Sequence, residues 1–146
     1  MSVRKTSIIC LTEISHYQIF VTDSLILGAK VNRYIVCAPN IGIGTTVKLP
    51  NINDPEAYVN KKMNDRFDSV LTNEYEFLKL DRYNFIIRRT DIRKIYHDPT
   101  HKWGMGYYPD QGKIYIESVK TNENHKTRRE LILVSRQYPN QILKLL

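Results

Sequence analysis

Short apolar runs recur along the first third of the chain, separated by polar turns or by turns that contain glycine or proline. The spacing between them is about ten residues. The runs cover residues 8–13, 17–22, 25–28 and 33–38. In the second run, Tyr17, Ile19 and Val21 alternate with more polar positions, which is typical of a half-buried strand. The pattern predicts an antiparallel meander that forms a sandwich or a barrel.

The apolar spacing then becomes helical. The positions on one predicted helix face are Val59, Met63, Phe67, Val70 and Leu71. Asn53 is suited to cap such a helix, with Glu56 three residues later completing a capping box. We therefore predict one helix over residues 53–72, followed by a strand over residues 75–80, where strict alternation returns.

The last third of the chain again has a β pattern. Its predicted strands cover residues 84–89, 113–119 and 129–134, and an apolar tail follows at residues 138–146. Pro139 is tolerated in the first turn of a helix, and a helix this short is unstable alone in water, so the tail is expected to cap the sheet. The predicted fold class is mainly β (α+β): one domain with an antiparallel bent sheet or partly open barrel, one inserted helix and a short C-terminal capping helix.

The order of these elements carries a family resemblance. The stretches concerned are residues 85–87, a strand-closing turn at 91–95, residues 112–116, residues 129–134 and the terminal helix, with residues 17–27 as paired early strands. This order resembles pleckstrin-homology-like and GRAM-like domains, including their small bacterial and archaeal members. The resemblance implies a strongly bent, partly open barrel capped by the C-terminal helix, with the helix over residues 53–72 as an insertion. Phosphoinositide binding, common in that family, does not carry over well, because the early loops here hold few cations.

The positive charge is distributed unevenly along the chain. The chain of 146 residues has a net charge of +7, and residues 81–146 hold 13 Lys/Arg against 7 Asp/Glu, a net +6. Such a concentration of positive charge attracts polyanions or acidic partners. The alternative is that the charge serves only solubility.

The cellular location is predicted from the cysteines and from the lengths of the apolar runs. Cys10 and Cys37 both lie in apolar runs, so we expect reduced core thiols rather than a disulfide scaffold. The first apolar run is too short for a signal peptide, and no run approaches the ~20 apolar residues of a membrane span. We predict a cytoplasmic protein without a transmembrane segment.

The loop between the predicted strands 84–89 and 113–119 alternates cations, glycines and aromatic residues. With its flanking strands it forms the predicted binding face, which consists of Arg88, Arg89, Arg93, Lys94, Lys102, Trp103, Tyr107, Tyr108 and Lys113. Rings at a loop tip can press against a partner while cations meet its anionic groups, so a protein partner or an anionic surface is expected. In the alternative interpretation, Trp103 and Tyr107 fold back over the sheet as a minor core.

Nucleic-acid binding is the second hypothesis. The tyrosines that lie among the cations are Tyr83, Tyr96, Tyr107, Tyr108 and Tyr115. Ring stacking together with phosphate contacts is how sheet-face proteins bind single strands. No sequence signature of a known nucleic-acid-binding motif accompanies these residues.

Catalysis is the third hypothesis and the least supported. His97, Asp98 and His101 are weak candidates for a metal site, but the proline at position 99 indicates a turn, and a solvated loop explains these residues better than a metal site does. No nucleophile motif or pair of catalytic acids is present. We therefore predict a non-enzymatic interaction module without a cofactor.

Overall fold

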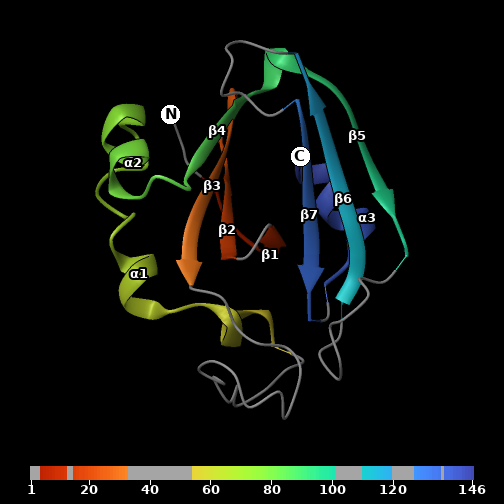
Figure 1. Ribbon diagram of the computed structural model, residues 1–146, viewed down its shortest axis with the longest axis horizontal. Helices are drawn as coiled ribbons and strands as arrows, with labels where there is room; N and C mark the ends of the chain where they lie inside the picture. Colours follow the sequence, from red (N-terminus) through yellow and green to blue (C-terminus); the bar gives the residue numbers. More distant parts are fainter. Residues whose placement is uncertain (1–3, 13–14, 33–53, 101–109, 120–126, 136) are drawn as a thin grey trace.

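The structure is a computed structural model that describes residues 4–12, 15–32, 54–100, 110–119, 127–135 and 137–146 (Figure 1). Its strands are β1 (Arg4–Thr12), β2 (Ser15–Val21), β3 (Leu25–Asn32), β4 (Phe85–Arg88), β5 (Ile92–Asp98), β6 (Asp110–Ser118) and β7 (Arg128–Val134). Its α-helices are α1 (Lys61–Asp65), α2 (Glu74–Leu80) and α3 (Pro139–Leu145), with the 3-10 turns η1 (Pro55–Tyr58) and η2 (Arg89–Asp91).

The strands form one antiparallel sheet in the order β4-β3-β2-β1-β7-β6-β5. β1 and β7 meet in the middle, where Cys10 pairs with Leu133 and Leu11 with Ile132. β4 and β5, which follow each other in the chain, occupy the two edges, so the sheet is not closed into a barrel. The prediction of a mainly β, antiparallel fold with a C-terminal helix is confirmed.

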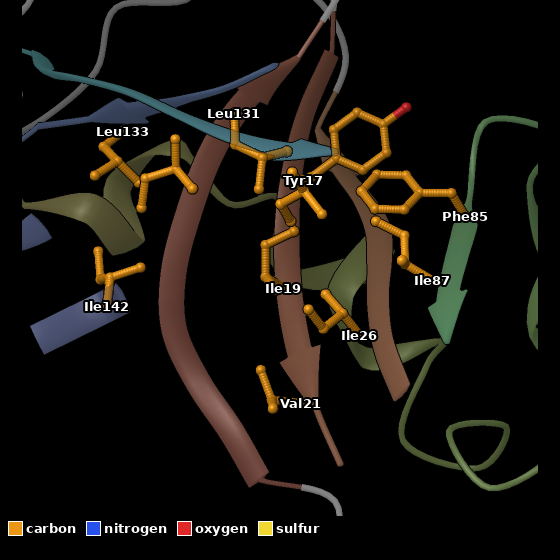
Figure 2. Packing of buried hydrophobic residues seen from close by; sticks show 11 residues of the cluster. Tyr17, Ile19, Val21, Ile26, Phe85, Ile87, Leu131, Leu133 and Ile142 are labelled. Atoms are coloured by element: carbon orange, nitrogen blue, oxygen red, sulfur yellow. The ribbon is translucent and has the colours of Figure 1, made fainter. Parts of the chain in front are cut away.

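The inner face of the sheet encloses the larger hydrophobic cluster, which joins both parts of the sheet (Figure 2). Its buried members are Tyr17, Ile19, Val21, Ile26, Phe85, Ile87, Ile114, Ile116, Leu131, Leu133 and Ile142. The alternation predicted for β2 therefore places Tyr17, Ile19 and Val21 inward. Ile142 of α3 belongs to the same cluster, so the terminal helix is docked by its apolar side as expected.

A second cluster lies on the outer face of β2, β3 and β4. It contains Phe20, Leu25, Leu27, Ala29, Val31, Phe67 and Phe77. Since Ile26 faces the inner cluster, β3 is buried on both faces and shows no clean alternation. This explains why the expected end of the strand near Gly28 is wrong. Gly28 lies inside β3, opposite Phe85, and a Cβ atom there would overlap the Phe85 ring.

The inserted segment departs from the prediction in two ways. The single helix expected over residues 53–72 is wrong, because the chain forms η1, the short α1 and then turns. The strand expected over residues 75–80 is also wrong, because α2 occupies it. Two asparagine caps set the starts of the observed helices. Asn60 Oδ1 accepts a hydrogen bond from Met63 N (3.2 Å) at the start of α1. Asn73 Oδ1 accepts a hydrogen bond from Glu76 N (3.1 Å) at the start of α2.

Strand β5 is the remaining correction. Residues 91–95 are predicted as a strand-closing turn, whereas η2 ends at Asp91 and β5 begins at Ile92. The register between β5 and β6 shifts between Ile92 and Lys94, which leaves Arg93 at an irregularity. A half-buried edge strand with such an irregularity has no clean apolar alternation in its sequence. The strand predicted over residues 33–38 lies outside the described residues.

Candidate binding face

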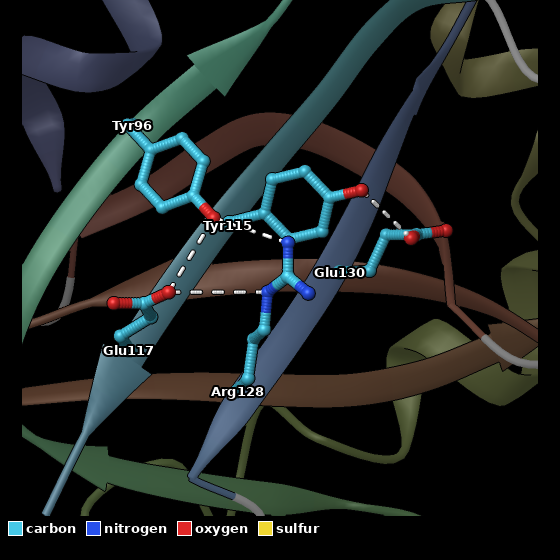
Figure 3. A network of polar contacts seen from close by, with 5 residues as sticks. All are labelled: Tyr96, Tyr115, Glu117, Arg128 and Glu130. Carbon is cyan, nitrogen blue, oxygen red and sulfur yellow. Dashed lines mark hydrogen bonds and ion pairs between the residues drawn. The ribbon is translucent and has the colours of Figure 1, made fainter.

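Strand register brings five polar and aromatic side chains together on the outer face of β5, β6 and β7. We call them the tyrosine network: Tyr96, Tyr115, Glu117, Arg128 and Glu130 (Figure 3). The inner cluster takes the alternate residues of β6, Ile114 and Ile116, so the residues between them point outward. Farther along β7, Ile132 and Val134 are buried, which confines the polar surface to the beginning of that strand.

Two tyrosine rings form the centre of the network. Tyr96 and Tyr115 are cross-strand partners, and their rings stack with centroids 5.2 Å apart and an interplanar angle of 27°. The Arg128 guanidinium lies over the Tyr115 ring at 4.2 Å, and its Nη2 donates a hydrogen bond to the Tyr96 hydroxyl at 3.1 Å. Tyr115 is consequently only 7% exposed although it lies on an outer face.

Two glutamates complete the hydrogen bonding and balance the charge. The Tyr115 hydroxyl donates to Glu130 Oε2 at 3.0 Å, and the Tyr96 hydroxyl donates to Glu117 Oε1 at 3.4 Å. Burial and, next, the hydrogen bond to Glu130 raise the pKa of Tyr115 above its ordinary value. The hydrogen bond to Tyr96 raises the pKa of Arg128, whose Nε also lies 3.9 Å from Glu117 Oε1.

Three of the predicted binding cations lie on or beside this face and form no ion pair with any described residue. Lys94 extends over the Tyr96 ring, with Nζ 4.7 Å from its centroid, and is exposed. Arg93 is exposed at the irregularity of β5. Lys113 pairs in register with Asp98, whose pKa is lowered mainly by hydrogen bonds from Thr100 and to a smaller extent by the charge of Lys113.

The structure does not bring Arg88 and Arg89 to the tyrosine network. Arg88 Nη2 forms an ion pair with Glu74 Oε2 of α2 at 2.9 Å, and both side chains are exposed. Arg89 connects α3 to the turn after β2. Its Nε donates a hydrogen bond to Thr22 O at 3.0 Å, and its Nη2 donates one to Leu145 O at 3.0 Å. Its Nη1 donates to the carbonyl of Leu146 as well, so two carbonyls at the helix end are satisfied by one guanidinium.

The remaining predicted side chains of the face are Lys102, Trp103, Tyr107 and Tyr108, which lie outside the described residues. The same holds for His101, the third member of the weak metal hypothesis. Consecutive strand residues point to opposite faces, so His97 and Asp98 diverge on β5. His97 Nε2 hydrogen-bonds Gln111 O at 2.7 Å, and within the described ranges no three His, Cys, Asp or Glu side chains are grouped to hold a metal ion.

Both tyrosines of the network are among the residues predicted from the sequence, whereas its three charged members are not. Glu117, Arg128 and Glu130 are ordinary strand residues in the sequence, because only the register of three strands places them beside the rings. Their alternation with Ile116, Arg129 and Leu131 is the signal that would assign them to an outer face.

No protein-family model, curated protein sequence or solved structure matches this chain significantly. In the part of the chain that the structure describes, no helix is long and apolar enough to cross a membrane.

Proposed function

We propose that this chain is a non-enzymatic protein-binding module of pleckstrin-homology-like kind, which takes an extended acidic segment of its partner along the β5 edge. The observation that carries this proposal is the combination of an edge strand with cations that lack ion pairs. β5 pairs only with β6 among the described strands, so no described strand pairs with the other side of its backbone, where strand addition would take place.

Charge supports an acidic partner. Arg93 and Lys94 are exposed on β5, and Lys113 follows on β6, without ion pairs in the described structure. Their attraction to carboxylates would speed association and select acidic over basic segments. β4, the other edge, suits this role less, because it has four residues and its Arg88 is already paired with Glu74.

The element order supports the family assignment within the proposal. A meander of antiparallel strands, an unclosed sheet and a docked C-terminal helix agree with what the resemblance implies. The inserted segment between β3 and β4 would then be a family-external addition that covers one outer face.

Binding can be tested with a fluorescent peptide of alternating valine and glutamate, measured by anisotropy at low salt. The double reversal R93E/K94E is expected to weaken binding at least about tenfold, because two attractive charges become repulsive. The matched control is K61E/K62E, which makes the same charge change at two exposed positions of α1. Equal weakening in both variants, or no binding by the unaltered chain, would contradict the proposal.

Nucleic-acid binding is the second candidate, favoured by the stacked tyrosines and the neighbouring cations. Stacking of bases needs an uncovered ring face, whereas Arg128 covers Tyr115 and Lys94 lies over Tyr96. A salt-titrated gel-shift assay with single-stranded RNA and DNA tests it directly. Absence of a shift at low salt removes this candidate, since the electrostatic contribution is largest there.

A further inference from the structure

Arg129 differs from its neighbour Arg128 because it faces the inside of the sheet. In register it lies opposite Ile116, whose side chain belongs to the inner cluster. Its guanidinium reaches across to the other part of the sheet and lies over the Phe85 ring of β4, 3.9 Å from the centroid. Arg129 is partly buried and links β7 to β4 across the inner face of the sheet.

The guanidinium of Arg129 has no acid or hydrogen-bond acceptor among the described residues. Its Nε is buried and makes no hydrogen bond. Partial burial lowers the pKa of Arg129, because it removes part of the hydration of the charged guanidinium. The contact with Phe85 offsets part of that cost, but a ring face does not satisfy N–H donors.

Two more cations border the same aromatic group. Tyr17 packs against Phe85 with ring centroids 5.5 Å apart, and its hydroxyl donates to the Tyr83 carbonyl at 3.0 Å. Two cations lie over the Tyr83 ring: Lys30 Nζ is 4.6 Å from the ring centroid and the Arg82 guanidinium carbon is 4.7 Å from it. Neither cation forms an ion pair within the described ranges.

This group lies away from the docked helix. Figure 2 shows Ile142 of α3 beside Leu133, with Tyr17 and Phe85 on the far side of Leu131. The residues of α3 (Pro139–Leu145) also include no acidic side chain that could neutralise Arg129.

We propose that Arg129 is the centre of a binding site for an oxyanion, a phosphate or carboxylate group of a small ligand. A guanidinium binds either group through paired N–H donors, and in the described structure the buried Nε–H of Arg129 has no acceptor. Binding would supply the acceptors that Arg129 lacks. The site is independent of the β5 edge and of the partner proposed for it.

The test is thermal unfolding of the chain in sodium phosphate and in sodium acetate, each compared with sodium chloride at equal ionic strength. A ligand that binds the folded state alone should raise the midpoint by roughly 3–5 °C at about ten times its Kd. A larger response to phosphate than to acetate identifies phosphate as the preferred group, and the reverse order identifies carboxylate.

Variants separate this site from general salt effects. R129M should abolish the anion-specific shift while the midpoint without ligand stays equal or rises, because an uncompensated charge is removed. R129K should keep only part of the shift, since lysine lacks the paired donors. R128M, the adjacent arginine on the opposite face, should respond to anions as the unaltered chain does.

Three outcomes overturn the proposal. The first is a midpoint that responds to phosphate and acetate no more than to chloride. The second is a shift that persists undiminished in R129M, which would be a general stabilisation by excluded salts. The third is equal loss of the shift in R128M and R129M, which would mean that overall charge is responsible.

Discussion

The outer face of β2, β3 and β4 lies beneath the inserted segment, whereas the outer face of β5, β6 and β7 carries the tyrosine network. On the first, Phe67 and Phe77 are fully buried against β3. On the second, tyrosines, arginine and glutamates satisfy one another at the surface. A covered face contributes to stability through apolar area removed from water, while an exposed face of satisfied polar groups contributes little.

The largest expected loss of stability comes from a substitution on the covered face. Phe77→Ala should lower the free energy of unfolding by about 3–5 kcal/mol, because it removes a buried ring from the outer cluster. Urea unfolding measures it. Leu78→Ala is the matched control on the same helix: its side chain is 44% exposed, and the change should stay within about 0.5 kcal/mol. Similar losses in both variants would mean that α2 does not use Phe77 to cover the sheet.

Adjacent arginines supply the next contrast. Arg89→Ala should cost about 1.5–3 kcal/mol, since charged hydrogen bonds to Thr22 and to the end of α3 are lost. Arg88→Ala should cost at most about 1 kcal/mol, because its ion pair with Glu74 is exposed. Denaturant unfolding compares the two, and α3 should exchange its amide hydrogens faster only in Arg89→Ala. Equal effects would contradict the structural role assigned to Arg89.

Changes on the tyrosine network should be smaller. Tyr96→Phe removes the hydroxyl that links Arg128 and Glu117 but keeps the stacked ring, so the expected loss is below about 1 kcal/mol. Peptide binding at the β5 edge should be retained. A loss of several kcal/mol would show that this face stabilises the fold as strongly as the covered one.

The smallest expected effect is the pH dependence of the contribution that Tyr115 makes to stability. Because the pKa of Tyr115 is raised above 10.0, its stabilising contribution is complete below that pH and is lost as pH rises through the folded value. The tyrosinate absorbance of the chain, compared with Tyr115→Phe, should contain one component that titrates late. Glu130→Gln should move that component toward the ordinary value, since the neighbouring negative charge is gone. If it does not move, the hydrogen bond to Glu130 is not among the causes.

The sequence predicts some elements well for a clear physical reason. In β2, alternate residues face the inner cluster, so period-two alternation is visible. In α3, Pro139 marks the first turn and Ile142 marks the buried side. The failures have equally clear reasons. Residues 75–80 alternate in polarity by accident, while the cap at Asn73 and the burial of Phe77 make them a helix. β5 is only half-buried and its register is irregular, so its sequence shows no clean alternation.

What the sequence by itself determined is the class of fold, because local polarity patterns record which side of each strand or helix is buried. The excess of positive charge in the last third of the chain and the tyrosines among those cations can also be read directly from the sequence. Only the tertiary structure decided which cations are engaged: Arg88, Arg89 and Arg129 lie within 36 residues of Arg93 in the chain and have different surroundings. Register, the docking of α3 and the approach of β4 to β7 create those surroundings, and contacts between residues far apart in sequence leave no local pattern to read.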